Sequence, residues 1–80
     1  MNEPVPIYPP IVGAVAQWLV DDGAVVAEDE VVCQVESMKV FFEVRAPAAG
    51  TLRYRAELGE IVGQEDPVAE IVPHAEGTEG

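Results

Sequence analysis

The sequence predicts a single all-β domain, folded as a small sandwich or barrel with approximate twofold symmetry. Short apolar runs separated by turn residues recur along the chain at regular spacing, which is typical of antiparallel strands. The second half of the chain repeats the glycine, proline and valine pattern of the first half. No segment shows the sustained period of an amphipathic helix.

The repeat relates the two halves at an almost constant spacing. Pro10 corresponds to Pro47 and Gly23 to Gly59, which are offsets of 37 and 36 residues. Two copies are too few for a solenoid, which buries a continuous core only with about three or more. They suit a closed domain with a twofold axis. The matching segments are Pro10–Gly13 with Pro47–Gly50, Asp22–Val26 with Leu58–Val62, and Glu30–Val35 with Asp66–Ile71.

Eight segments have the composition of strands. The first is confined to a sheet edge, because Pro4 and Pro6 cannot donate hydrogen bonds to a ladder. The second is rich in Val, Trp and Leu and long enough to bend, and Gly13 permits a close backbone approach there. The expected bounds are Val5–Tyr8, Val12–Val20, Val25–Val26, Val31–Glu36, Val40–Arg45, Thr51–Arg55, Ile61–Val62 and Val68–Val72.

Turn residues separate these strands. Gly23, after Asp21 and Asp22, and Gly59, after Leu58, occupy equivalent turns in which glycine takes a positive φ. The third strand is followed by a polar corner at 27–30, and residues 46–50 lead into the sixth strand.

The fourth and fifth strands alternate between apolar and polar residues, which predicts a hairpin of fixed register. In the fourth strand Val31, Cys33 and Val35 are expected on one face, opposite Val32, Gln34 and Glu36. In the fifth strand Val40, Phe42 and Val44 are expected on one face, opposite Phe41, Glu43 and Arg45. If Phe42 lies in the core, Phe41 is largely exposed beside the turn and becomes a candidate partner contact.

Composition narrows the functional classes. The chain has 80 residues, a net charge of −11 and only four cations, Lys39, Arg45, Arg53 and Arg55, so a nucleic-acid partner is not expected. The acidic surface serves either solubility or steering toward basic partner clefts. No apolar run approaches the roughly 20 residues of a membrane span. The start shows no secretory signal and the single cysteine fits a reducing compartment, so we expect a cytoplasmic protein.

Lys39 is the only lysine, and it lies between the two halves of the repeat. The expected hairpin holds its amine on a rigid projection with no competing lysine. A free lysine amine has a pKa of about 10.4, so an enzyme that acylates it must supply the base. A lone hairpin lysine is ordinarily a solvated surface residue, but its position in the repeat favours covalent modification.

The residues Glu36-Ser37-Met38-Lys39, followed by Ala46-Pro47-x-x-Gly50-Thr51, resemble the biotinyl domain of biotin-dependent carboxylases and decarboxylases. The resemblance covers about residues 5–73, with 1–4 and 74–80 as tails. It implies a flattened β-barrel or sandwich of two four-stranded halves related by a quasi-dyad. It also implies that Lys39 accepts biotin and that Glu36, Ser37, Met38 and Val40 form the surrounding motif. Val40 stands where the commonest form of the motif has methionine.

The same resemblance implies a carrier rather than an enzyme. A biotin protein ligase would attach biotin, and the domain would shuttle carboxybiotin between a biotin carboxylase and a carboxyltransferase. A lipoyl domain, which shares the fold and the lysine hairpin, is the nearest alternative, although that family generally has aspartate before the lysine and this chain has Met38. An unmodified scaffold of the same fold is another alternative.

The remaining residues that could take part in catalysis or binding are expected to have no functional role. Cys33 shares the apolar face of its strand, so we expect it in the core rather than as a reactive thiol. Trp18 is expected to pack in the core. His74 follows Pro73 in the tail without a partner for metal or base chemistry.

Overall fold

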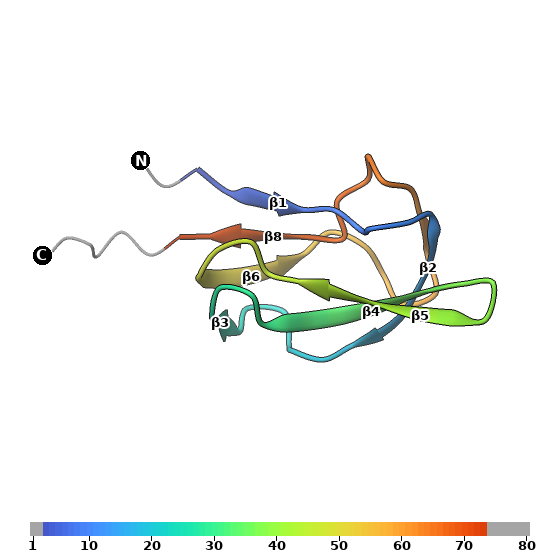
Figure 1. Cartoon of the computed structure of the whole chain (residues 1–80). Coiled ribbons are helices and arrows are strands. Elements are labelled where there is room, and N and C mark those ends of the chain that lie inside the picture. Colours follow the sequence, from blue (N-terminus) through green and yellow to red (C-terminus); the bar gives the residue numbers. More distant parts are fainter. Residues whose placement is uncertain (1–2, 74–80) are drawn as a thin grey trace, which may run out of the picture.

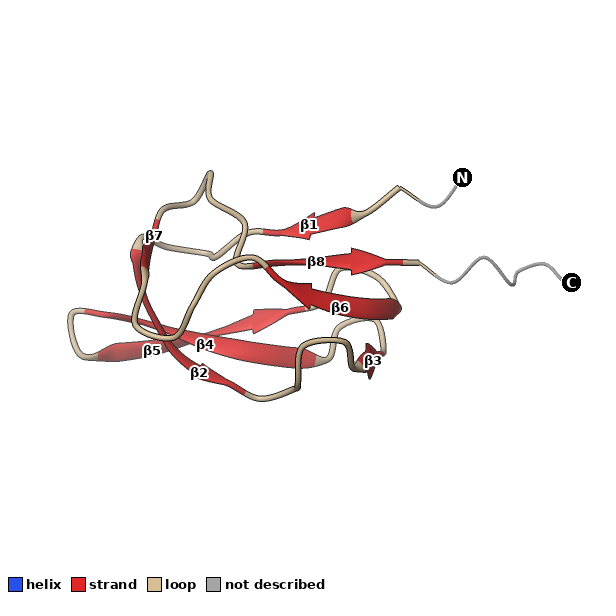
Figure 2. Cartoon of the chain, turned by 180° about the vertical axis from the view of Figure 1, so that it is seen from behind, coloured by secondary structure: helices blue, strands red, loops and turns tan. Residues whose placement is uncertain are grey.

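The computed structural model describes residues 3–73, which form two four-stranded antiparallel sheets (Figures 1 and 2). The strands are β1 (Val5–Ile7), β2 (Gly13–Trp18), β3 (Val25–Val26), β4 (Val31–Ser37), β5 (Val40–Arg45), β6 (Gly50–Tyr54), β7 (Ile61–Val62) and β8 (Ala69–Val72). The predicted all-β class is confirmed, and the expected strand ends agree within two residues. The described residues contain no helix, and so none long and apolar enough to cross a membrane.

The order of strands in the two sheets confirms the twofold symmetry predicted from the repeat. One sheet runs β1-β8-β6-β3 and the other β5-β4-β2-β7. Exchanging β1 with β5, β2 with β6, β3 with β7 and β4 with β8 converts one order into the other. Each sheet therefore takes two strands from each half of the chain, and neither half can complete a sheet alone.

The core lies between the two sheets and draws on both halves. Val15 and Val35 from one half and Leu52 and Ile71 from the other are at most 1% exposed. The buried cluster consists of Ile7, Val15, Val26, Val32, Cys33, Val35, Val44, Ala46, Leu52, Ala56, Val62, Val68, Ala69 and Ile71. Burial of apolar side chains from both halves in one core stabilises the association of the two halves.

The predicted alternation in β4 is wrong at Val32. Val32 and Cys33 are consecutive, yet both are fully buried, whereas Val31 is only half-buried. The pairing with β5 shifts between Val31 and Cys33, so Val32 is the extra residue of a β-bulge. An extra residue breaks the period of two, and a periodicity argument does not foresee it.

The alternation in β5 is confirmed, but burial fades toward the turn. Val44 is buried, Phe42 is half-buried and Val40 is 51% exposed, although all three belong to one face. Phe41, on the opposite face, is 55% exposed, as expected. The β4–β5 hairpin projects from the body of the domain at the end opposite the start of β1 and the end of β8 (Figure 1). Its tip therefore has no second sheet to cover it.

The glycine turns of the two halves have the same geometry. Gly23 has a φ of 93° and Gly59 a φ of 88°, which confirms the expected positive values. The Gly23 amide donates to the Leu52 carbonyl and the Gly59 amide to the Val15 carbonyl, each at 2.7 Å. These turns thus bind each half to a strand of the other half.

Candidate functional site

The only lysine lies at the tip of the β4–β5 hairpin. The turn consists of Met38 and Lys39 alone, and the flanking residues Ser37 and Val40 form the first pair of the ladder. Six residue pairs join the two strands. The five pairs nearest the turn are consecutive, so Lys39 is held at the end of a regular ladder rather than on a long loop.

Both residues of the turn have left-handed backbone conformations. The φ of Met38 is 52° and that of Lys39 is 68°. A two-residue hairpin turn of this kind matches the twist of its strands, but glycine and asparagine usually supply the positive φ. A side-chain-bearing residue in this conformation costs roughly 1–2 kcal/mol. The ladder imposes this strain, and strain of this kind is concentrated at functional sites.

The Lys39 side chain is exposed. Neither a hydrogen bond nor an ion pair holds its amine within residues 3–73, and the adjacent Met38 is 92% exposed. Arg45, on the same hairpin, is instead engaged, with Nη2 2.8 Å from Glu43 Oε1 and Nη1 2.9 Å from the Asp29 carbonyl oxygen. The amine is thus free to enter the active site of another protein.

The other predicted site residues surround the turn. Glu36 and Ser37 end β4 and are half-buried, and Val40 begins β5. Glu36 pairs across the ladder with Phe41. The Glu36 carboxylate makes no hydrogen bond or ion pair with the described part of the chain. The structure therefore gathers these residues in one place without supplying a base against the Lys39 amine.

Cys33 is a core residue, as predicted. It is fully buried, and burial raises the pKa of its thiol to about 12. The thiolate is therefore disfavoured at neutral pH, and the residue is not a nucleophile there. His74 and the expected tail at 74–80 lie outside the described residues.

Trp18 packs against the core but is not fully buried. Its ring stacks on Tyr54, with centroids 3.9 Å apart and an interplanar angle of 15°. The Tyr54 hydroxyl donates to the Val20 carbonyl at 2.6 Å, whereas Trp18 Nε1 is buried without a hydrogen-bond partner among residues 3–73. The sequence pattern did not predict this stacked pair. The available signal was that each aromatic residue ends one of two equivalent strands, β2 and β6.

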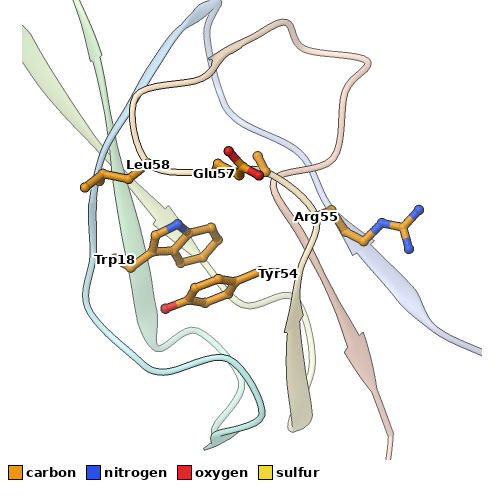
Figure 3. A pocket seen from close by; sticks show the side chains of 6 residues that line it. Trp18, Tyr54, Arg55, Glu57 and Leu58 are labelled. Atoms are coloured by element: carbon orange, nitrogen blue, oxygen red, sulfur yellow. The ribbon is translucent and has the colours of Figure 1, made fainter.

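The stacked rings line an open pocket of about 440 Å³ (Figure 3). Leu58 and Glu57 close its other side, and Leu58 is 65% exposed. Trp18 pairs with Cys33, six residues before Lys39, so the pocket lies away from the hairpin tip. The pocket and the lysine are therefore separate features of the surface.

Residues 5–71 match the family described as biotin-requiring enzyme, whose domains carry covalently attached biotin or lipoate. The chain belongs to this family. Such a domain is a carrier for a covalently attached group within an enzyme complex, and it is not itself catalytic. This agrees with the exposed lysine hairpin and with the symmetric pair of sheets.

Comparison with curated proteins gives no significant match. Among solved structures, the chain is similar to urea carboxylase of Kluyveromyces lactis, with a TM-score of 0.80 and 25% identity over 90% of this chain. The match spans only 6% of urea carboxylase. It is also similar to the lipoyl domain of the 2-oxoglutarate dehydrogenase complex of Azotobacter vinelandii. That likeness has a TM-score of 0.62 and 28% identity, and covers 100% of this chain and 98% of the other. The fold is thus shared by a part of a carboxylase and by a lipoyl domain.

Proposed function

We propose that Lys39 carries biotin in amide linkage and that the domain presents it to a biotin carboxylase and a carboxyltransferase. The observation that carries this proposal is Lys39 at the strained hairpin tip, exposed and without a partner in residues 3–73, and directly preceded by Met38. It is the only lysine in the chain, so no second side-chain amine competes with it. The proposal places this carrier in the cytoplasm.

The hairpin fits an amide-linked group. A ligase can reach the Lys39 amine because nothing in the described structure covers or binds it. In the attachment step, the amine nitrogen forms a bond to the carboxyl carbon of biotin, and the bond to AMP in the biotinyl adenylate breaks. A base of the ligase takes the amine proton. Met38, Glu36, Ser37 and Val40 are the side chains that the ligase meets around this amine.

The domain itself contributes presentation. When bound, biotin supplies a ring nitrogen that accepts and releases a carboxyl group. The β4–β5 ladder holds the attachment point away from the body of the domain, so the group can enter a partner active site. Tethering makes the second encounter effectively intramolecular, which raises the local concentration of the group. The acidic surface, with a net charge of −11, favours basic clefts on the partners.

A lipoyl carrier is the second candidate. The observation that favours it is the 28% identity with a lipoyl domain over essentially the full length of both chains. Met38 favours biotin, because lipoyl domains generally have aspartate before the lysine. Lipoate would occupy the same amine, so the two candidates differ in which ligase recognises the hairpin.

Parallel expression beside a biotin protein ligase and beside a lipoate ligase tests the proposal. We expect the intact mass of the wild-type domain to rise by one biotinyl group with the first ligase and to stay unchanged with the second. The Met38→Asp variant should be biotinylated more slowly and become a better lipoate acceptor, because the substitution converts the Met38-Lys39 pair toward the lipoyl pattern. A lipoyl adduct on the wild type would favour the second candidate, and no adduct with either ligase would favour an unmodified scaffold.

A further inference from the structure

A row of side chains crosses the outer face of the sheet that carries the hairpin. Phe41 pairs with Glu36, Glu36 with Ala14, and Ala14 with Ile61, so the row spans β5, β4, β2 and β7. Directly paired residues of antiparallel strands project to the same face. We call Phe41, Ala14 and Ile61 the apolar row.

The apolar row faces away from the core. Phe41 is 55% exposed and Ile61 68% exposed, whereas Val62, next to Ile61 in β7, is 2% exposed. Phe41 and Ile61 stand on opposite edge strands, about 14 Å apart for three strand spacings. Ala14, between them, is small, so a partner side chain can approach the sheet there. These two large apolar side chains offer area that a partner could bury on this outer face.

The charge beside the row is negative. Glu36 interrupts the row between Phe41 and Ala14, and its carboxylate has no partner within residues 3–73. Lys39 is the cation at the turn, and acylation of its amine removes that charge. The modified hairpin therefore combines apolar side chains with an unpaired carboxylate, which complements an apolar surface bearing a lysine or arginine.

The twofold symmetry supplies a comparison surface at the other end of the domain. There Val72 pairs with Thr51, and Thr51 with Val25. Val25, the counterpart of Ile61, is 69% exposed, but these three positions include neither an aromatic residue nor a carboxylate. The pairing of an exposed phenylalanine with a free glutamate thus belongs to the lysine end.

We propose that the apolar row is the docking surface for the biotin carboxylase that acts on the group at Lys39. The partner face carries apolar side chains against Phe41 and Ile61 and a basic side chain opposite Glu36. The row begins two residues from Lys39 and continues from the hairpin, so a partner that takes the attached group covers it. This inference rests on the proposed function and adds to it the residues that determine partner affinity.

Threonine substitutions in the full 80-residue chain test the docking surface, because threonine suits strands and puts a small polar side chain in place of a large apolar one. Each biotinylated variant serves as the substrate of the source organism's biotin carboxylase, with ATP and bicarbonate. We expect Phe41→Thr to raise KM about five- to tenfold and Ile61→Thr about two- to fivefold. In both, kcat should stay unchanged. Val25→Thr is the matched control and should keep the wild-type KM.

Glu36→Gln adds an electrostatic readout. Removing the carboxylate should raise KM and make it depend less steeply on salt concentration, because a screened charge pair across the interface is lost. A salt dependence identical to that of the wild type would contradict the basic partner group. Circular dichroism and thermal midpoints of all variants check that the fold is retained.

Three results would overturn the docking surface. These are a wild-type KM for both Phe41→Thr and Ile61→Thr, an equal rise for Val25→Thr, and a loss confined to the rate of biotinylation. The last result would assign the row to the ligase instead. Avidin capture of the wild-type domain reports the proposed function separately. An uncaptured wild type ends both proposals, whereas a captured wild type with unchanged KM values ends only this one.

Discussion

The lysine end and the terminal end of the domain are related by the twofold axis, yet they differ in one decisive way. At the lysine end, β4 continues into β5 through a two-residue turn, and six residue pairs form the ladder. At the other end, β8 and β1 pair at three positions, but they are the last and the first strand, so no turn joins them. The symmetric fold thus contains two equivalent strand pairs, of which only one is closed and extended.

Away from these ends, the halves agree in detail. The Ala27 amide donates to Glu30 Oε1 at 2.8 Å, and the Gly63 amide to Asp66 Oδ2 at 2.9 Å. These contacts occupy equivalent corners, 36 residues apart. The comparison teaches that symmetry is kept where it serves stability. It is broken at the hairpin, where the strained turn carries Lys39, the proposed attachment site.

The largest expected effect concerns the close strand contacts of Gly13 and Gly50. A Cβ on Gly13 would lie 2.4 Å from the Glu36 carbonyl oxygen, and one on Gly50 would lie 2.4 Å from the Val72 carbonyl oxygen. Because both obstacles are backbone atoms in paired strands, Gly13→Ala and Gly50→Ala should each lower the free energy of unfolding by about 3 kcal/mol or more.

Urea denaturation measures both glycine variants against the wild type. Similar losses at the two ends would support equal packing of the two halves. A variant with wild-type stability would contradict the close contact at its site.

The next largest effect is expected at Cys33. Its counterpart in the second half is Ala69, and both residues are fully buried, but only Cys33 has a side chain that ionises. Burial raises the Cys33 pKa from 9.0 to about 12 in the folded state. A raised pKa stabilises the fold fully below the unfolded value, and this contribution is lost as pH rises from about 9 to 12. Wild-type stability should therefore fall faster than that of Cys33→Ala, by up to about 1.4 kcal/mol per pH unit. Parallel pH profiles in urea denaturation would contradict this account.

A smaller loss of stability, equal in the two halves, is expected for substitutions at Gly23 and Gly59. A Cβ on Gly23 or Gly59 would meet nothing within 4 Å, so only the positive φ opposes a side chain. Gly23→Val and Gly59→Val should each cost about 1–2 kcal/mol. Thermal midpoints should fall by about 4–8 °C per kcal/mol in a domain of this size. Unchanged midpoints in both variants would remove the argument from backbone conformation.

Much of the fold was predictable because the repeated positions are glycine, proline and valine, which have strong preferences for turns or strands. Gly23 and Gly59 fixed the equivalent turns, and the offset of 36 or 37 residues predicted the twofold relation. The apolar face that holds Cys33 and Val35 predicted their burial. The order of strands in the sheets was not predictable in this way, because it depends on pairing between distant segments.

The hairpin that carries Lys39 was predictable in position, but the conformation of its turn was not. The lone lysine between two alternating strands located the hairpin, yet neither Met38 nor Lys39 is a residue type that signals positive φ. The ladder imposes that conformation from outside the turn. Likewise Val40 belongs to the inner face by alternation but is 51% exposed, because the hairpin extends beyond the core.

Mapping the residue that accepts biotin is the most direct test of the proposal. The wild-type domain and Lys39→Arg are expressed beside a biotin protein ligase, and each is measured by intact mass, peptide mapping and avidin capture. Arginine keeps the positive charge but lacks the primary amine. We expect one biotinyl group on the wild type, located on Lys39, and none on the variant. Avidin capture of Lys39→Arg, or a biotinyl group located elsewhere in the wild type, would contradict the central claim.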